Sequence, residues 1–326
     1  MVKVVFEGQP FEIPEDTTLL DGLLECGVEV PHGCKTGTCQ SCLLKCTAGE
    51  IPAEAQQGLR ESQRLNHLFL SCQCPPREGM QATHPHTAAD RITATIEHLR
   101  RLTPDIMEVI LQPSRECVYR AGQFIRLFNP EGISRAYSLA SVSGLDAALA
   151  FHIREYPEGI LSQWIHHHLS VGDQVTISDP MGECFYLPGH PSQALLMIGT
   201  GSGLAPLYGI LRDALEQGHT GPIHLLHGAR TAEGLYLQNE LNQLMALHPQ
   251  LDYQPCISDP QAPLPLQAVR GRASDIALAT HPDLRGWRIF LCGNPDMVRA
   301  MNIQSYLAGA ALGEIHADPF DCQAPV

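Results

Sequence analysis

Cysteines crowd the beginning of this chain. Of the 12 cysteines in 326 residues, seven lie within the first 74. Cys34, Cys39 and Cys42 form the pattern C-x4-C-x2-C, and Cys72 follows after 29 intervening residues. Four thiolates with this spacing are typical of a [2Fe–2S] cluster, in which one tight loop supplies three ligands and a distant strand is expected to supply the fourth. The pattern therefore predicts an iron–sulfur centre rather than disulfides, which a reducing cytosol disfavours.

Two alternatives to this ligand set stay open. Zinc also binds four cysteines, but zinc sites usually pair two C-x2-C elements, so the three-plus-one arrangement favours iron–sulfur. Cys74 could replace Cys72 as the fourth ligand, although the Leu-x-Cys context favours Cys72. Gly33 and Gly37 would let the backbone wrap close to the cluster and aim N–H groups at its sulfurs. The cysteines interpreted as small buried or partly exposed thiols are Cys26, Cys46, Cys117, Cys184, Cys256 and Cys322.

A glycine-rich loop is the next pattern with chemical meaning. Gly199, Gly201 and Gly203 follow an apolar run at residues 194–198 and precede a stretch with helical spacing at residues 204–215. Between a strand and a helix, such glycines let the backbone approach a pyrophosphate at the helix N-terminus. The third glycine comes one residue earlier than in the Rossmann pattern G-x-G-x-x-G, and a proline follows. A tight turn without a ligand is the alternative interpretation.

Regular patterns around these motifs indicate three domains. In residues 1–83, apolar alternation predicts a hairpin, and residues 16–18 can cap a short helix. The stretch 31–49 is rich in Gly, Cys, Thr and Ser and is expected to be loop. The short polar stretch 83–89 contains a proline and is expected to be a linker.

The other two domains differ in the spacing of their apolar residues. In residues 90–187, short apolar runs separated by Pro, Gly and Ser predict a small antiparallel barrel with one helix at 161–169. Three histidines in that helix, at 166–168, point in different directions and are expected to be polar surface. In residues 188–326, strand and helix patterns alternate, which predicts a parallel α/β domain. The expected fold class is therefore multidomain, α+β and α/β.

Composition excludes several classes of protein. Apolar residues make up 44% of the chain, enough for hydrophobic cores. No stretch approaches the ~18 consecutive apolar residues that a membrane helix needs. The 35 acidic and 21 basic residues give a net charge of −14, which argues against a nucleic-acid binder. The first residues have no apolar run after a basic cluster, so a cytoplasmic protein is expected.

The motifs of the first two domains resemble those of known families. Residues 1–82 resemble a plant-type ferredoxin domain, which implies a β-grasp fold. Arg135-Ala136-Tyr137-Ser138 resembles the R-x-Y-S motif of ferredoxin–NADP reductase-like flavoenzymes, which implies FAD. Arginine can donate to a pyrophosphate, tyrosine can lie against the isoalloxazine ring, and serine can hydrogen-bond a flavin edge atom. The resemblance adds as flavin-binding positions His152, Ile153, Arg154, Gly159, Leu161, Ser162 and Phe320, the last covering the flavin.

The third domain resembles the nicotinamide domain of the same flavoenzymes. Its glycine loop is similar to the family's G-x-G-x-G-x-x-P, and the segment 292–297 is similar to C-G-x-P-x-M, whose cysteine lies near the hydride-transfer face. The resemblance implies catalytic roles for Cys292 and Ser138. The implied dinucleotide contacts are Gly199, Thr200, Gly201, Gly203, Pro206, Arg230, Cys292, Gly293, Asn294 and Met297. The acid Glu233 and the lack of a second basic residue after Arg230 favour NADH, while Arg230 keeps NADPH possible.

The order of the three domains resembles the reductase components of bacterial multicomponent oxygenases, such as benzoate dioxygenase and methane or toluene monooxygenase systems. The resemblance implies that FAD takes an electron pair from NADH and passes single electrons to the [2Fe–2S] cluster, which reduces an oxygenase or hydroxylase component. Two other functions stay open: a reductase with the same modules serving a deoxysugar dehydratase, and a redox sensor without turnover. No nucleic-acid or membrane partner is expected.

Overall fold

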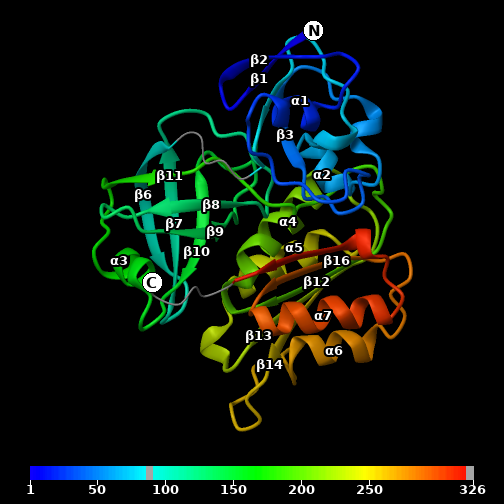
Figure 1. Ribbon diagram of the computed structural model, residues 1–326. Helices are drawn as coiled ribbons and strands as arrows, with labels where there is room; N and C mark the ends of the chain where they lie inside the picture. Colours follow the sequence, from blue (N-terminus) through cyan, green and yellow to red (C-terminus); the bar gives the residue numbers. More distant parts are fainter. Residues whose placement is uncertain (86–90, 321–326) are drawn as a thin grey trace. The chain divides into compact units, whose positions relative to one another are not determined.

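The computed structural model describes residues 1–85 and 91–320, which belong to two compact units, Met1–Ala88 and Ala89–Val326 (Figure 1). Most of the expected linker at 83–89 lies outside the described residues, as does Cys322. Within the described residues, no helix is long and apolar enough to cross a membrane.

A five-stranded sheet forms the first unit. Its strands are β1 (Val2–Phe6), β2 (Gln9–Ile13), β3 (Leu43–Ala48), β4 (Leu68–Leu70) and β5 (Gln81–Thr83), in the spatial order β2-β1-β5-β3-β4. Strands β1 and β5 run parallel, and the other neighbours run antiparallel. The predicted hairpin is confirmed as β1 and β2. The helical segments of this unit are α1 (Leu19–Glu25), α2 (Glu61–Leu65), η1 (Ala53–Gln56) and η2 (Ser71–Gln73).

Helix α1 forms where the sequence predicts a capped helix. Thr18 is the N-cap, and its Oγ1 accepts a hydrogen bond from the N–H of Asp21 at 3.1 Å, which satisfies one otherwise unpaired donor of the first turn. Leu19, Leu20 and Leu23 are fully buried and belong to the core of this unit. The cap and the apolar face together fix the helix against the sheet.

The stretch 31–49 differs from the expectation of a loop, because β3 occupies its second half. The strand pairs with β5 on one side and β4 on the other. Leu44 and Cys46 are buried while their neighbours are more exposed, which is the alternation of a half-buried strand. The sequence did not indicate this strand, because its buried and exposed residues alternate over only four positions and directly follow the loop rich in glycine and cysteine.

The second unit begins with the predicted antiparallel barrel. Its strands are β6 (Ile92–Arg101), β7 (Ile106–Pro113), β8 (Phe124–Phe128), β9 (Ser134–Ser138), β10 (Leu149–Arg154) and β11 (Gln174–Ile177), in the order β10-β7-β6-β11-β8-β9. A bridge between Leu139, just after β9, and Phe151 in β10 joins the two edges. The R-x-Y-S motif and the expected flavin-binding residues 152–154 therefore lie on strands that meet where the barrel closes.

The histidines of helix α3 (Ile160–His167) correct one expectation. His167 and His168 are exposed, as predicted, but His166 is buried. Its Nε2 lies 2.9 Å from the carbonyl oxygen of Ile153, and burial lowers the pKa of the ring below its usual value. His166 therefore anchors the helix to strand β10. The sequence could not show this, because His166, His167 and His168 are identical residues and nothing in the pattern tells which one is buried.

A six-stranded parallel sheet forms the rest of the second unit. Its strands are β12 (Leu195–Thr200), β13 (Ile223–Ala229), β14 (Leu251–Ile257), β15 (Val269–Arg270), β16 (Arg288–Gly293) and β17 (Ile315–Pro319), in the order β15-β14-β13-β12-β16-β17. Helices α4 (Leu204–Glu216) and α5 (Gln238–Leu247) pack on one face, and α6 (Ala273–Thr280) and α7 (Pro295–Leu307) pack on the other (Figure 1). The strand order reverses between β12 and β16, which is where ligands bind in such sheets.

An ion pair joins the barrel to helix α4. Both guanidinium NH groups of Arg212 donate to the carboxylate of Asp146 at 2.8 Å, and both side chains are about one quarter exposed. The Arg212 guanidinium also lies 5.3 Å from the ring centre of Tyr208. A planar guanidinium that binds a carboxylate through two bonds restricts the angle as well as the distance between the two elements.

Candidate functional site

Backbone N–H groups surround the first two cysteines of the metal motif. The Sγ of Cys34 accepts hydrogen bonds from the N–H groups of Thr36 and Cys39, and the Sγ of Cys39 accepts one from the N–H of Cys34, each at 3.4 Å. The Thr36 side chain and these amides lower the pKa of Cys34 to about 6. The exposed loop therefore favours the thiolate, which is the form that binds metal.

The other two metal-motif cysteines form a second, buried pair. Burial raises the pKa of Cys42, and the neighbouring thiol of Cys72 raises it further. Cys72 lies in the turn η2 directly after β4, rather than on a strand as expected. The Nε2 of Gln73 donates to the carbonyl of Lys35 at 3.2 Å and so ties this turn to the cysteine loop. Within the described residues, no three His, Cys, Asp or Glu side chains form a group that could hold a metal ion.

Cys74 faces a different environment from Cys72. It is fully buried, and its Sγ lies 3.5 Å from the carbonyl of Pro75 and 4.0 Å from the Sδ of Met80. Burial raises the pKa of this thiol to about 12. Cys72 belongs to the same buried cluster but lies against Cys42 instead.

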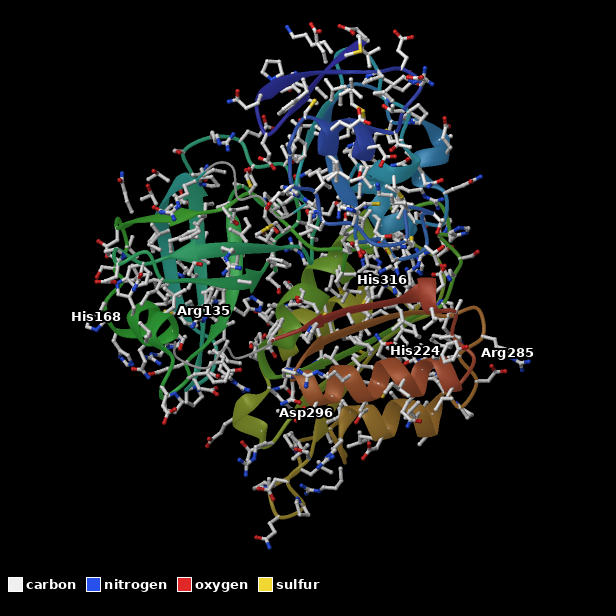
Figure 2. All side chains as sticks on the ribbon, in the orientation of Figure 1. Arg135, His168, His224, Arg285, Asp296 and His316 are labelled. Atoms are coloured by element: carbon white, nitrogen blue, oxygen red, sulfur yellow. The ribbon has the colours of Figure 1, made fainter. Side chains whose placement is uncertain are left out.

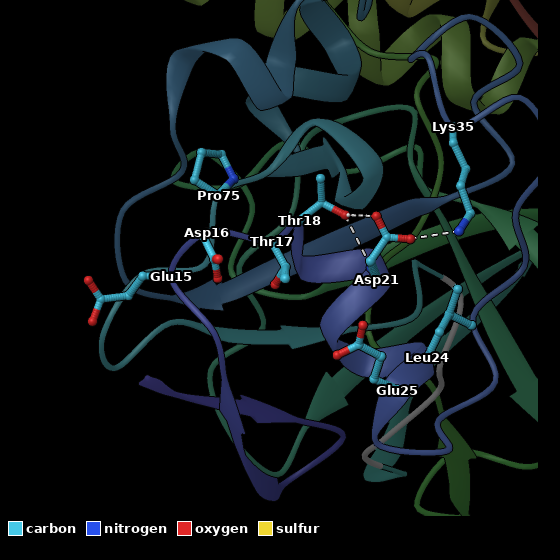
Figure 3. Close-up of a pocket in the computed structure, with 9 residues that line it drawn as sticks. All are labelled: Glu15, Asp16, Thr17, Thr18, Asp21, Leu24, Glu25, Lys35 and Pro75. Atoms are coloured by element: carbon cyan, nitrogen blue, oxygen red, sulfur yellow. Dashed lines mark hydrogen bonds and ion pairs between the residues drawn. The ribbon is translucent and has the colours of Figure 1, made fainter.

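A shallow hollow of about 840 Å³ lies beside the cysteine loop, at the N-terminal end of α1 (Figure 3). The Nζ of Lys35 donates to Asp21 at 2.6 Å across this hollow, and that bond lowers the pKa of the carboxyl. Its lining residues are Glu15, Asp16, Thr17, Thr18, Asp21, Leu24, Glu25, Lys35 and Pro75. The ion pair connects the helix to the residue that follows the first metal-motif cysteine.

Ser138 connects the barrel to the parallel sheet. Its Oγ, at the end of β9, donates a hydrogen bond of 2.5 Å to Oδ2 of Asp318 in β17. Burial raises the pKa of Asp318 to about 6, and the bond from Ser138 opposes that shift. A carboxyl group with a pKa of about 6 therefore lies where the end of β9 in the barrel meets β17 of the parallel sheet.

The glycine loop and the segment after β16 touch through their backbones. A Cβ at Gly203 would lie 2.3 Å from the carbonyl oxygen of Cys292, so only glycine fits there. Gly201 has a φ of +56°, in the left-handed region that favours glycine. The N–H of Asn294 donates to Oγ1 of Thr200 at 3.0 Å, and the Asn294 side chain caps helix α7. The carboxyl ends of β12 and β16 thus form one continuous backbone surface.

Cys292 is the penultimate residue of β16 and is fully buried. Its Sγ lies 3.8 Å from the Sγ of Cys184, and burial holds the pKa of the Cys292 thiol well above its usual value. Cys292 is therefore a neutral thiol at physiological pH.

Three family models match consecutive parts of the chain. They describe a 2Fe-2S iron–sulfur cluster binding domain over residues 4–77, an oxidoreductase FAD-binding domain over 94–186 and an oxidoreductase NAD-binding domain over 197–302. The reductase component of the naphthalene 1,2-dioxygenase/salicylate 5-hydroxylase systems of a Ralstonia species is 32% identical over 311 residues, which cover 93% of each chain. The chain belongs to the family of iron–sulfur flavoprotein reductases.

Two further relatives support this membership. The reductase subunit of an aromatic O-demethylase from an Amycolatopsis species is 33% identical, with 90% of each chain covered. The crystal structure of an Amycolatopsis cytochrome P450 reductase has a TM-score of 0.69 and 30% identity, and the match covers 98% of this chain and 99% of that one. The predicted fold class, the cofactors [2Fe–2S], FAD and NAD(P)H, and the assignment as an NAD(P)H-dependent oxidoreductase are thereby confirmed.

The donors of this reductase fit an iron–sulfur cluster in its first unit. Thiolates are soft ligands that suit iron, and peptide N–H groups already point at the two exposed sulfurs. Gly33 leaves room beside the loop, because a Cβ there would lie 3.4 Å from the Sγ of Cys39. Gly37, at a φ of +83°, lets the loop turn against Gln73.

The residues expected at the flavin differ in whether their side chains still have free hydrogen-bond donors. Arg135 lies on β9 (Figure 2), and among the described residues its guanidinium has one partner, the carbonyl of Ser134 at 2.8 Å, so donors remain for a diphosphate. Tyr137 packs against the barrel core, and burial raises its pKa. The hydroxyl of Ser162 is used within the turn before α3, where it donates to Gly159 and accepts from Tyr156. The N-terminal N–H groups of α3 are then the donors available for a phosphate.

Several expected contact residues can offer only backbone atoms. Ile153 and Leu161 lie in the barrel core, and Pro206 is buried in the first turn of α4. Met297 packs on the apolar cluster under α7. The polar residues expected to make contacts differ in exposure: His152 is buried, Arg154 lies against Gly201, and Arg230 is exposed. Phe320, the expected aromatic cover, is half-buried, and its N–H donates to the Gly293 carbonyl at 2.8 Å.

Sequence reasoning missed Asp318 as a functional residue. It lies two residues before Phe320, the residue expected to cover the flavin. The carboxylate lies on the same edge of the sheet as Gly293, because β17 pairs with β16 in parallel and Asp318 is opposite Cys292. An acid two residues before the aromatic side chain is the signal that could have indicated it.

Proposed function

We propose that this reductase passes electrons from NADH through FAD and the [2Fe–2S] cluster to the oxygenase or hydroxylase component of a multicomponent oxygenase. The observation that carries the proposal is the presence of all three cofactor domains on one chain, in the order found over nearly the full length of relatives named as reductase components. Those relatives include a phenol hydroxylase protein from Acinetobacter pittii, 30% identical over 89% of this chain.

The proposed division of the chain follows the sequence boundaries. Residues 1–83 form the iron–sulfur domain, 90–187 the FAD domain and 188–326 the nicotinamide domain. Cys34, Cys39, Cys42 and Cys72 hold the cluster, and Cys72 is favoured as the fourth ligand because it lies against Cys42, whereas the Sγ of Cys74 lies against Met80. We propose a cytoplasmic location, because a reducing compartment keeps the thiols of the metal motif free of disulfides.

The chain's own residues prepare the junction between flavin and dinucleotide. When bound, FAD accepts an electron pair and releases single electrons. Arg135 supplies fixed positive charge toward the flavin diphosphate, and the Gly199–Gly203 loop offers backbone N–H groups at the start of α4. Cys292 keeps the region beneath the nicotinamide neutral, and Ser138 donates a hydrogen bond to Oδ2 of the Asp318 carboxylate.

NADH is the proposed donor rather than NADPH. Arg230 is exposed, and among the described residues its side chain has no hydrogen-bond or ion-pair partner, so it is available to a ribose or a phosphate. Glu233 follows three residues later in the short turn η4 (Ala232–Gly234), and a carboxylate there disfavours a 2′-phosphate. Comparing kcat/KM for the two dinucleotides tests this choice, and a preference for NADPH would contradict it.

The proposed function is tested by electron transfer from NADH to two classes of acceptor. The purified holoenzyme should reduce ferricyanide, cytochrome c and the purified oxygenase component of an aromatic dioxygenase or phenol hydroxylase system. Bleaching of the acceptor's iron absorbance measures the last transfer. Reduction of small oxidants without any transfer to the oxygenase components would contradict the proposed partner but leave the oxidoreductase activity intact.

The fourth ligand is tested with a matched pair of serine variants. Cys72→Ser should lose the cluster's visible absorbance and about two irons per chain, because serine is a poor substitute for soft sulfur. Cys74→Ser should keep both, and lose roughly 1 kcal/mol of unfolding free energy because it places a hydroxyl in the core. The opposite pattern of iron content would make Cys74 the ligand.

A further inference from the structure

A line of buried aromatic and imidazole side chains runs from the barrel to the glycine loop. It consists of His152 in β10, Tyr236 between η4 and α5, and His227 in β13, and all three are less than a tenth exposed. None of the metal, flavin or dinucleotide contacts described above uses the side chains of Tyr236 and His227. The line ends on the carbonyl of Gly201, within the loop expected to receive the pyrophosphate.

The hydrogen bonds in this line have a defined direction. Burial lowers the pKa of His227 to about 4 and that of His152 to about 3, so both rings are neutral at physiological pH. The Nε2 of His227 lies 3.2 Å from the carbonyl oxygen of Gly201. A carbonyl can only accept, so Nε2 carries the hydrogen and donates it. Nδ1 of the same ring is buried and has no hydrogen-bond partner among the described residues.

Tyr236 fixes the His227 ring from the side of the barrel. Its hydroxyl lies 3.2 Å from Nδ1 of His152, whose Nε2 faces a carboxylate oxygen of Glu108 at 3.8 Å. The Tyr236 ring meets the His227 ring edge-on, with centroids 5.4 Å apart and planes at 86°. The His227 ring is therefore confined by an aromatic side chain that is itself hydrogen-bonded to the barrel.

Two donors hold the Gly201 carbonyl, the Nε2–H of His227 and the backbone N–H of Leu204, and its orientation determines where a peptide N–H points. A trans peptide is planar, and its C=O and N–H point in opposite directions. Turning the Gly201 carbonyl toward buried His227 therefore turns the N–H of Ser202 away from it. Gly201 reaches this orientation with its φ of +56°, in the left-handed region that favours glycine, and the Arg154 guanidinium lies beside it, 2.7 Å from where a Cβ would be.

We propose that His227 is a positioning residue of the dinucleotide site. Its Nε2–H fixes the Gly201–Ser202 peptide in the orientation that presents an N–H to the pyrophosphate, and Tyr236 with His152 keeps the imidazole in place. The inference rests on the proposed use of NADH. It assigns His227 no contact with the dinucleotide itself, so its effect belongs to binding of the diphosphate and not to the rate of electron transfer from bound NADH.

A pair of amide variants tests the donor atom. Glutamine places its amide nitrogen near the position of Nε2, whereas asparagine is one methylene too short to reach it. His227→Asn should raise the KM for NADH and the inhibition constant of ADP-ribose, a diphosphate probe without nicotinamide, by ~3–10-fold, which corresponds to the loss of one neutral hydrogen bond. His227→Gln should keep both constants near those of the unchanged protein. In both variants kcat with ferricyanide at saturating NADH should change little.

A control variant and a second variant complete the experiment. His219 is a buried histidine bonded to the hydroxyl of Tyr186 and outside the line, so His219→Gln should leave both constants unchanged. Tyr236→Phe should move both constants in the same direction as His227→Asn but less. FAD content measures folding in every variant. Equal effects of His227→Gln and His227→Asn, or a change in KM without a change for ADP-ribose, would overturn the proposal, whereas an unchanged protein that neither oxidises NADH nor binds ADP-ribose would refute the proposed function instead.

Discussion

The cysteine loop of the first unit and the dinucleotide junction of the second are built in opposite ways. In the loop, the contacts that prepare the sulfurs join residues two to five positions apart, and both Cys34 and Cys39 are exposed. At the junction, Ser138 and Asp318 are 180 positions apart, and the neighbouring Cys292 is fully buried. Local chain geometry suffices for the first site, whereas the second exists only once the barrel and the parallel sheet are both folded.

The largest effect expected from this difference is that one substitution in the cysteine loop removes cytochrome c reduction and leaves ferricyanide reduction. Cys39→Ser should abolish reduction of cytochrome c by NADH, because this one-electron acceptor takes electrons from the cluster. Reduction of ferricyanide should remain, because the small oxidant reaches the flavin and the junction needs no residue of the first unit. Steady-state rates with the two acceptors measure the separation.

Cys26→Ser is the matched control for that change. Cys26 is an exposed cysteine of the same unit and lies outside the metal motif, so both rates should stay unchanged. Full cytochrome c activity in Cys39→Ser would mean that electrons leave from the flavin, and the order of carriers proposed above would be wrong.

The second effect concerns the pH dependence of the junction. Burial raises the pKa of Asp318 to about 6 in the folded protein, against an ordinary value near 4, so the folded state binds the proton more tightly than the unfolded state. The free energy of unfolding should therefore fall as pH rises from ~4 to ~6, by roughly 2 kcal/mol once partial exposure is discounted. Asp318→Asn should remove this slope, as measured by urea unfolding at several pH values. A slope unchanged by the substitution would contradict the shifted pKa.

A smaller effect is expected at the ion pair between the barrel and α4. Arg212→Met should lower the free energy of unfolding of the second unit by about 1–2 kcal/mol, because it leaves the half-buried carboxylate of Asp146 without its bidentate partner. The cluster's absorbance should not change. Thermal unfolding followed by flavin fluorescence measures the loss, and a variant as stable as the original chain would show that the pair contributes nothing to the junction.

The smallest effect is expected for the corresponding pair in the first unit. Lys35 and Asp21 are each more than 40% exposed, and exposed ion pairs contribute ~0–1 kcal/mol. Lys35→Met should therefore change stability less than Arg212→Met does, and less than Thr18→Ala, which removes the N-cap of α1 and costs about 1 kcal/mol. Unfolding followed by cluster absorbance compares Lys35→Met with Thr18→Ala. A larger loss of unfolding free energy in Lys35→Met would contradict the expectation that the exposed ion pair contributes less than the helix cap.

The same difference decides how much could be predicted from the sequence. The spacing of Cys34, Cys39 and Cys42 and the glycine loop after β12 are local patterns, and each indicated its chemistry directly. The partner of Ser138 could not be found in that way, because only the parallel pairing of β17 with β16 brings Asp318 to the barrel. His166 was misjudged for a related reason: its burial depends on the Ile153 carbonyl in a strand before the helix.

The position of Asp318 in the last strand also matters while the chain is being made. The first unit has all four of its metal-motif cysteines once residue 72 has been synthesised, so its loop can fold and take up iron early. The junction must wait for β17, and at ~5–20 residues per second that delay is roughly ten seconds or more. During this interval the nascent chain can carry a completed iron–sulfur unit beside a barrel whose Ser138 has no carboxylate to bind. A ribosome that stalls between these points would release a product with one finished redox centre and one unfinished one.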